Sequence, residues 1–268
     1  HNPEGIDTNN EILYTVKLCM FCGRCGTACE NSAIEVSRNL EHHLNRGRCH
    51  RCGRCVDVCP TGALEKVGRV VDVDEIMEEV LRDRVYYEES NGGLTISGGE
   101  PLLQAEFSLQ LLQAAKEAAL HTCLETCGFG DITALTALAA FSDLVLFDVK
   151  EFDPELHRQW TGKSNISINK NLKTLDKQHV PIILRCPIVP GLNLREDHLH
   201  GIAEIAGELK NRTGIHLMTF HKFGLSKQQA LGRTPPDALA NISLPKFEEM
   251  EHLRETLATL WEGEVEIS

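Results

Sequence analysis

The chain has 268 residues, enough to bury one large core or a core with a small appended module, and its 42% hydrophobic content excludes a wholly disordered protein. A formal net charge of -12, from 27 basic and 39 acidic residues, argues against nucleic acid or an anionic membrane as the main partner. No apolar stretch approaches the length that spans a bilayer, so a soluble, cytoplasmic protein is expected.

The first feature in chain order is the opening His-Asn-Pro-Glu-Gly, which has no initiator methionine before it. A single histidine is not a tag, so this start predicts a cut from something longer. We expect a boundary near residue 13, because a different kind of segment begins at residue 14.

Residues 14–70 hold eight of the eleven cysteines, in two blocks that repeat the spacing C-x2-C-x2-C-x3-C. In the ferredoxin pattern with this spacing, three thiolates hold one 4Fe-4S cluster and the fourth cysteine of the block crosses to the other cluster. The first predicted ligand set is Cys19, Cys22, Cys25 and Cys59. The second is Cys49, Cys52, Cys55 and Cys29. The alternative is zinc, which uses four ligands from paired C-x2-C knuckles and leaves the third and fourth cysteines of each block without a place.

Residues 71–268 alternate between helical and strand patterns. The predicted strands are 94–97, 121–126, 144–149, 181–186, 215–220 and 265–267. The predicted helices are 71–89, 107–118, 131–141, 154–160, 167–178, 196–210 and 246–261. This alternation predicts βαβ units and a parallel sheet. If the sheet curls into a full or partial barrel, its chemistry lies at the carboxyl ends of the strands.

Polar and glycine residues gather where the predicted strands end. They are residues 97–101, Glu125 with Thr126, residues 148–150, Arg185, and His221 with Lys222. Taken singly, Glu125 and Arg185 also fit surface loops, and His221 fits a hydrogen-bonded loop histidine. Lys150 also fits a surface ion pair with Glu151 or Asp153. Cys123, Cys127 and Cys186 are expected to be ordinary packed thiols.

Four elements in this order resemble the glycyl radical enzyme activating enzymes of the radical S-adenosylmethionine superfamily. They are the opening HNPEG, the cysteine module, the Gly-Gly-Glu-Pro run at 98–101, and Asp148-x-Lys150. The resemblance covers essentially the whole chain. It implies a partial (β/α)6 TIM-like barrel that lacks its first strand and cluster loop here, with an inserted two-cluster ferredoxin-like module.

The resemblance also divides the chain. Residues 1–13 would be the remnant of the radical-cluster loop, 14–70 the ferredoxin-like domain, and 71–268 the barrel that binds S-adenosylmethionine. In the family a C-x3-C-x2-C motif precedes HNPE and holds a third, radical-generating 4Fe-4S cluster. The 268 residues contain no such motif, so this chain by itself is expected to be inactive.

Site roles follow from the same resemblance. The implied cofactor-binding residues are His1, Asn2, Gly98, Gly99, Glu100, Glu125, Asp148, Val149, Lys150 and His221. Lys150 would offer a cation to the methionyl carboxylate, and Arg185 would face the cavity; these two are the catalytic candidates. Asp148 would bind the ribose or share a monovalent cation with Glu125 and Thr126.

The implied activity uses S-adenosylmethionine and one electron to remove a hydrogen atom from a glycine of a partner glycyl radical enzyme. Flavodoxin or ferredoxin would donate the electron, and a monomer is expected. Two alternatives are a plain iron-sulfur electron carrier and a radical S-adenosylmethionine enzyme that acts on a small molecule. The residues do not identify which glycyl radical enzyme is the partner.

Overall fold

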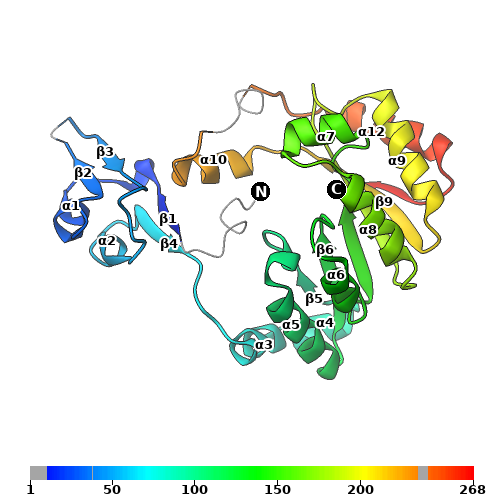
Figure 1. The fold of residues 1–268 in the computed structure, drawn as a ribbon, viewed down its shortest axis with the longest axis horizontal. Helices are drawn as coiled ribbons and strands as arrows, with labels where there is room; N and C mark the ends of the chain where they lie inside the picture. Colours follow the sequence, from blue (N-terminus) through cyan, green and yellow to red (C-terminus); the bar gives the residue numbers. More distant parts are fainter. Residues whose placement is uncertain (1–10, 38, 235–240) are drawn as a thin grey trace. The chain divides into compact units, whose positions relative to one another are not determined.

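The protein divides into two compact units in a computed structural model that describes residues 11–37, 39–234 and 241–268 (Figure 1). The first unit comprises His1–Val70 and Lys222–Ala240. The second comprises Val71–His221 and Asn241–Ser268. Among the described residues, no helix combines the length and apolar character needed to cross a membrane.

The first unit is built from four short strands in two antiparallel pairs. β1 (Glu11–Tyr14) pairs with β4 (Leu64–Val67), and β2 (Ile34–Val36) pairs with β3 (His42–Leu44). Its helical elements are the 3-10 helix η2 (Val16–Leu18), α1 (Arg24–Ala28), α2 (Arg54–Asp57) and α10 (Phe223–Ala230). Strands this short leave most of the unit as loops around the cysteines.

A shift of 30 residues maps the first half of this unit onto the second. Gly23 and Gly53 precede α1 and α2 in the same left-handed conformation, with φ of 75° and 87°. Two residues earlier, Phe21 and Arg51 have φ of 53° and 55°, values that residues other than glycine rarely adopt. The sequence repeat is therefore also a repeat of backbone conformation.

Helix α10 belongs to the first unit although it lies far along the chain. The Arg46 guanidinium donates to the carbonyl oxygens of Ile12 (2.9 Å) and Ala230 (3.0 Å), which ties α10 to β1. The expected division at residue 70 left this segment with the barrel. The structure differs because these long-range hydrogen bonds have no counterpart in local sequence pattern.

The second unit is organised on a six-stranded parallel sheet with the order β10-β9-β8-β7-β6-β5. Its strands are β5 (Gly93–Ile96), β6 (His121–Thr126), β7 (Leu144–Asp148), β8 (Ile182–Ile188), β9 (Arg212–Thr219) and β10 (Val265–Ile267). Neighbours in space are neighbours in sequence, as in a barrel, whereas a doubly wound sheet reverses its order. The parallel sheet predicted from sequence is confirmed.

Helices connect the strands and cover one face of the sheet. They are α3 (Val73–Arg82), α4 (Arg84–Ser90), η3 (Pro101–Gln104), α5 (Ala105–Glu117), α6 (Ile132–Ala139), α7 (Pro154–Thr161), α8 (Ile166–Asp176), α9 (Glu196–Glu208) and α12 (Phe247–Leu260). The helix predicted over 71–89 is two helices. The backbone bends at Asp83, whose carbonyl accepts from the N–H groups of Tyr86 and Tyr87 to start α4.

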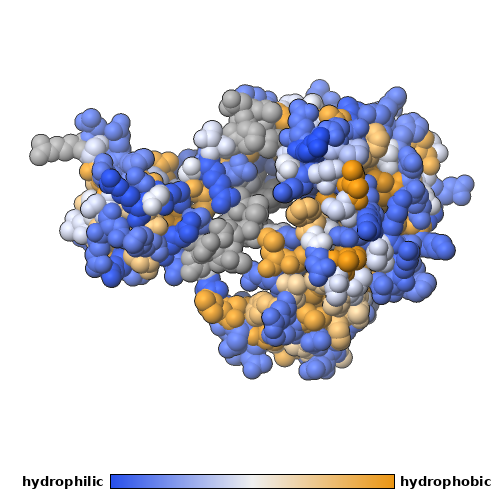
Figure 2. Space-filling view, in the orientation of Figure 1, coloured by the Kyte–Doolittle hydropathy of each residue, from blue (hydrophilic) through white to orange (hydrophobic). Residues whose placement is uncertain are grey.

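Strand β8 shows how the sheet is layered. Ile182, Leu184, Cys186 and Ile188 are fully buried against the helices, while the alternate residues, including Arg185, are only partly buried. Figure 2 shows hydrophilic residues over most of the visible outer surface of this unit, with apolar residues scattered among them. The partly buried face of β8, which carries Arg185, is the face that can hold a polar site.

Candidate functional site

The loop after β5 is fixed to the end of β6 by Glu100. Its carboxylate accepts from the Thr126 hydroxyl (2.6 Å) and from the N–H groups of Cys127 (2.9 Å) and Leu102 (3.2 Å). Gly98 precedes it with φ of 111°, a conformation that favours glycine, and the space where a Cβ would lie is open. The glycine therefore shapes an exposed loop that Glu100 holds in place.

Glu125 and Arg185 form an ion pair across the inner face of the sheet. Their side chains are 28% and 17% exposed. The Ser97 hydroxyl donates to the other oxygen of Glu125 (3.0 Å), so the loop after β5 joins β6 and β8 in this contact. The sequence predicts both residues at strand ends, and the structure brings them into direct contact.

Asp148 and Lys150 form a second pair at the end of β7. Lys150 Nζ donates to Asp148 Oδ2 at 2.8 Å. Burial acts to lower the pKa of Lys150, but the charge and hydrogen bond of Asp148 outweigh it and the net pKa is raised. The ammonium is therefore charged at neutral pH. Asp148 pairs in register with Arg185 on β8, so the two ion pairs share one edge of the sheet.

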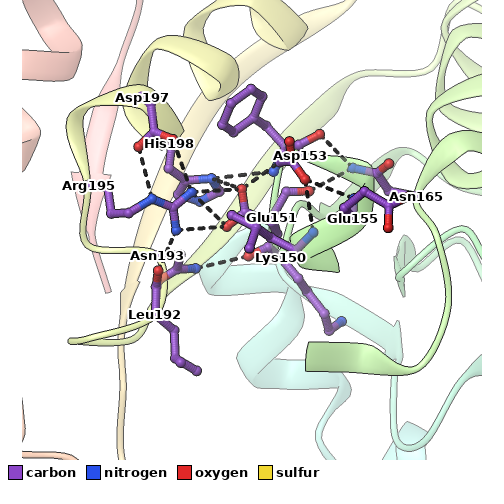
Figure 3. Close-up of polar contacts among 12 residues, drawn as sticks. Lys150, Glu151, Asp153, Glu155, Asn165, Leu192, Asn193, Arg195, Asp197 and His198 are labelled. Atoms are coloured by element: carbon purple, nitrogen blue, oxygen red, sulfur yellow. Dashed lines mark hydrogen bonds and ion pairs between the residues drawn. The ribbon is translucent and has the colours of Figure 1, made fainter. Parts of the chain in front are cut away.

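A buried cluster supports the backbone directly after Lys150 (Figure 3). Glu151 is 1% exposed, and its carboxylate contacts Arg195 at 3.2 Å and accepts from the N–H of Asp153 at 3.1 Å. His198 Nδ1 lies 3.4 Å from the same carboxylate. Burial acts to raise the pKa of Glu151, but His198, the Asp153 N–H and Arg195 together lower it to about 2.

Asn193 links this backbone to the loop after β8. Its side-chain amide donates to the carbonyl oxygens of Lys150 (2.9 Å) and Pro187 (2.7 Å), and its oxygen accepts from the Val189 N–H (2.6 Å). The Lys150 side chain extends away from the buried cluster, while its carbonyl faces Asn193 (Figure 3). The sequence patterns do not indicate Asn193, Glu151, Arg195 or His198 as parts of a site. An asparagine after Pro-Gly was the one available signal, because asparagine commonly hydrogen-bonds turn backbone.

The strand-end site has a charge balance suited to a cationic ligand. Three carboxylates, on Glu100, Glu125 and Asp148, stand against two cations, on Lys150 and Arg185, a formal excess of one negative charge. S-adenosylmethionine carries a sulfonium, an amine and a carboxylate, for a net charge of one positive at neutral pH. The residues present therefore fit this cofactor by charge, with Lys150 available for its carboxylate.

The first predicted cysteine set surrounds a single cavity in the first unit. Cys19, Cys22, Cys25 and Cys59 all line it, together with Tyr14 and His42. Cys59 comes from the second sequence block, as the crossed arrangement requires. The described residues contain no group of three or more His, Cys, Asp or Glu side chains converging on one metal ion. A four-iron cluster is several atoms across, so its four ligands surround a volume and do not meet at a point.

Backbone N–H groups donate to the sulfur atoms in both blocks. Phe21 N lies 3.4 Å from Cys19 Sγ, and Arg51 N lies 3.3 Å from Cys49 Sγ at the equivalent position. Burial acts to raise the pKa of Cys59, but N–H groups of the loop that follows it outweigh burial and lower the pKa. Such donors stabilise thiolate, the form that ligates iron.

Other predicted residues lie as follows. Gly99 is exposed in the loop with Gly98, Val149 is buried and its N–H donates to the Arg185 carbonyl (2.8 Å), and His221 is half-buried after β9. His1 and Asn2 lie outside the described residues. Burial raises the pKa of the Cys123 and Cys127 thiols to about 11 and also raises that of Cys186.

Family models match both units. Residues 46–216 match the model of the radical SAM superfamily, and residues 18–63 match that of the 4Fe-4S dicluster domain. A solved domain of pyruvate-formate lyase-activating enzyme from Bacteroides vulgatus superposes with a TM-score of 0.55 at 22% identity, covering 66% of this chain and 99% of that domain. At this identity the likeness shows the fold alone.

Several curated relatives align over most of the chain. The choline trimethylamine-lyase activating enzyme of Oleidesulfovibrio alaskensis is 37% identical over 92% of this chain and 83% of its own length. The (2S)-3-sulfopropanediol dehydratase activating enzyme of Klebsiella oxytoca is 33% identical over 94% and 81%. The indoleacetate decarboxylase activating enzyme of Tractidigestivibacter scatoligenes is 33% identical over 96% and 83%.

Proposed function

We propose how this chain works, starting from its family. The chain belongs to the radical SAM superfamily and, within it, to the activating enzymes of glycyl radical enzymes. These enzymes use S-adenosylmethionine to generate a glycyl radical on a second protein, and this activity was the one implied by the sequence. The 4Fe-4S clusters and S-adenosylmethionine predicted as cofactors are confirmed. A plain electron carrier or a small-molecule enzyme is not favoured.

S-adenosylmethionine binds, in this proposal, at the carboxyl ends of β5 to β8. The support is the charge balance at this edge, with Lys150 placed for the methionyl carboxylate and Glu100 shaping the glycine loop. When bound, the cofactor supplies the one-electron chemistry that removes hydrogen from the target glycine. The contribution of the chain is to hold the cofactor in one orientation and to exclude water.

The role of the predicted cation ligands follows from their present contacts. Glu125 is paired with Arg185 and accepts from Ser97, Thr126 donates to Glu100, and Asp148 holds Lys150. In our proposal Arg185 orients Glu125, and Glu125 in turn is the carboxylate nearest the cationic part of the cofactor. A monovalent cation shared by Glu125, Thr126 and Asp148 stays a prediction.

In this proposal the first unit holds two 4Fe-4S clusters in the crossed arrangement and passes single electrons. Cys19, Cys22, Cys25 and Cys59 hold the first, and Cys49, Cys52, Cys55 and Cys29 hold the second. The proposed donor is flavodoxin or ferredoxin, and the proposed form is a cytoplasmic monomer. The cluster chemistry supports the cytoplasmic location, because iron-sulfur clusters need free thiolates and a reducing compartment keeps thiols free.

One experiment tests this function. The full-length protein, reconstituted with iron and sulfide without oxygen, is mixed with S-adenosylmethionine, a one-electron reductant and each glycyl radical enzyme served by the relatives above. One of these partners is expected to acquire a glycyl radical signal in electron paramagnetic resonance (EPR). Cleavage of S-adenosylmethionine with no radical on any partner, but with turnover of a small molecule, would contradict the proposal.

A further inference from the structure

The two cluster sites of the first unit differ in the residues that β1 and β3 place beside them. The 30-residue repeat maps each cysteine of the first block onto one of the second, including Cys25 onto Cys55. It also maps Ile12 onto His42 and Tyr14 onto Leu44. The strand pairing follows the same 30-residue shift. Val36 of β2 pairs with His42 of β3, and their counterparts, Lys66 of β4 and Ile12 of β1, also pair.

Strand β3 therefore places a polar side chain, His42, at the position where β1 has the apolar Ile12. His42 Nε2 lies 3.6 Å from Cys25 Sγ, and both residues line the cavity of the first cysteine set. The counterpart of His42 is Ile12, which is 1% exposed and has no atom that can donate a hydrogen bond. Cys25 and Cys55 are otherwise alike, since both are buried in the same apolar cluster.

Tyr14 reinforces this difference. Its ring stacks on His42 with centroids 4.0 Å apart and an interplanar angle of 15°, which holds the imidazole in place. The Tyr14 hydroxyl is buried, lines the same cavity and has no hydrogen-bond partner among the described residues. A buried hydroxyl is costly without a partner, so this one fits a thiolate or cluster sulfur as acceptor. Its counterpart in the repeat is Leu44.

We propose that His42 and Tyr14 give the first cluster the higher reduction potential, so that an electron entering the unit comes to rest on the first cluster and not on the second. Reduction adds one negative charge to a cluster, and donors to its sulfur atoms stabilise that charge. With both clusters bound, one electron would pass from the reduced second cluster to the oxidised first cluster, and no bond would be made or broken. A low-potential one-electron donor supplies it. His42 is a positioning residue here, since it acts through Cys25.

This inference rests on the proposed grouping of cysteines, and the test separates the two. The intact chain is reconstituted, its iron is counted, and both midpoint potentials are followed by EPR at one fixed pH. We expect about eight irons and two midpoints. In His42→Ile, which gives the first site the residue of the second, one midpoint should fall by about 59 mV or more, a tenfold change in the one-electron equilibrium.

Matched variants sharpen the result. His43→Ile changes the next residue of β3, which is exposed, and should move neither midpoint. His42→Gln keeps an N–H donor and should therefore retain most of the difference between the two midpoint potentials. Ile12→His should raise the other midpoint, and Tyr14→Phe, which keeps the ring but removes the hydroxyl, should lower the first. Pulsed EPR should detect a histidine nitrogen coupled to one cluster, and this coupling should vanish in His42→Ile.

The outcomes are distinct. Zinc in place of iron would overturn both the grouping and this inference. About eight irons with midpoints and nitrogen coupling unchanged in His42→Ile would overturn the inference alone. Equal shifts of both midpoints would also overturn it, because the mechanism acts on one cluster.

Discussion

Arg185 and Glu125 are held together on the inner face of the sheet, although their strands β8 and β6 are separated by β7. A partly buried arginine and carboxylate in direct contact neutralise each other. The pair leaves Asp148 and Lys150 as the second charged contact at the same edge. In the site we propose, Arg185 therefore orients Glu125 through this contact.

A double-mutant cycle measures this contact. Glu125→Gln, Arg185→Gln and the double variant are unfolded with denaturant, and the coupling free energy is obtained from the four stabilities. Because the side chains are 28% and 17% exposed, we expect a coupling of about 1 kcal/mol, between that of exposed and fully buried pairs. A coupling of zero would show that the two side chains act independently.

Lys150→Gln should weaken binding of S-adenosylmethionine by about tenfold to a hundredfold, the range for losing a hydrogen bond to a charged group. Calorimetric titration of the full-length protein measures the affinity. The matched control is Lys173→Gln, because Lys173 is also ion-paired, with Glu208 at 2.8 Å, but lies on α8. Equal affinity of the Lys150 variant and the native protein for S-adenosylmethionine would show that Lys150 does not bind the cofactor.

Asn193→Asp tests whether the asparagine holds the Lys150 backbone. Aspartate keeps the shape but places a carboxylate against two carbonyl oxygens, so we expect a loss of about 3 kcal/mol in the free energy of unfolding. Asn193→Ala only leaves the carbonyls unsatisfied and should cost less. Affinity for S-adenosylmethionine should fall in both. An aspartate variant that is more stable than the alanine variant would contradict the two hydrogen bonds that the amide donates to these carbonyls.

Local patterns were sufficient for the sheet but not for what supports the site. The apolar segment 181–186 predicted β8, and the ends of the predicted strands placed Asp148, Lys150 and Arg185 together, because both are consequences of strand geometry. Glu151 is different. Its partner Arg195 lies 44 residues away, so its burial depends on tertiary packing that no local pattern records. The same holds for Arg46, whose contact with Ala230 spans 184 residues.

The pH dependence of stability tests the buried carboxylate directly. The pKa of Glu151 is lowered from 4.5 to about 2 in the folded protein. A carboxylate whose pKa is lowered on folding stabilises the folded state at pH values above its pKa in the unfolded chain. That stabilisation is lost as pH falls from about 4.5 to about 2. The difference corresponds to about 3 kcal/mol. Glu151→Gln should therefore be less stable than the native chain by a constant amount between pH 7 and pH 5, and the difference should shrink below about pH 4.5.

Tryptophan fluorescence is the suitable probe, because Trp160 and Trp261, the two tryptophans of the chain, both lie in the second unit. Arg195 stacks over Trp160 at 5.5 Å from its centroid, so the signal reports on the cluster itself. Glu155→Gln is the matched control, since Glu155 is exposed and pairs with Arg158 on the surface of α7. That variant should match native stability at every pH. A Glu151→Gln deficit that persists unchanged to pH 2 would mean that the lost stability comes from altered packing and not from the carboxylate charge.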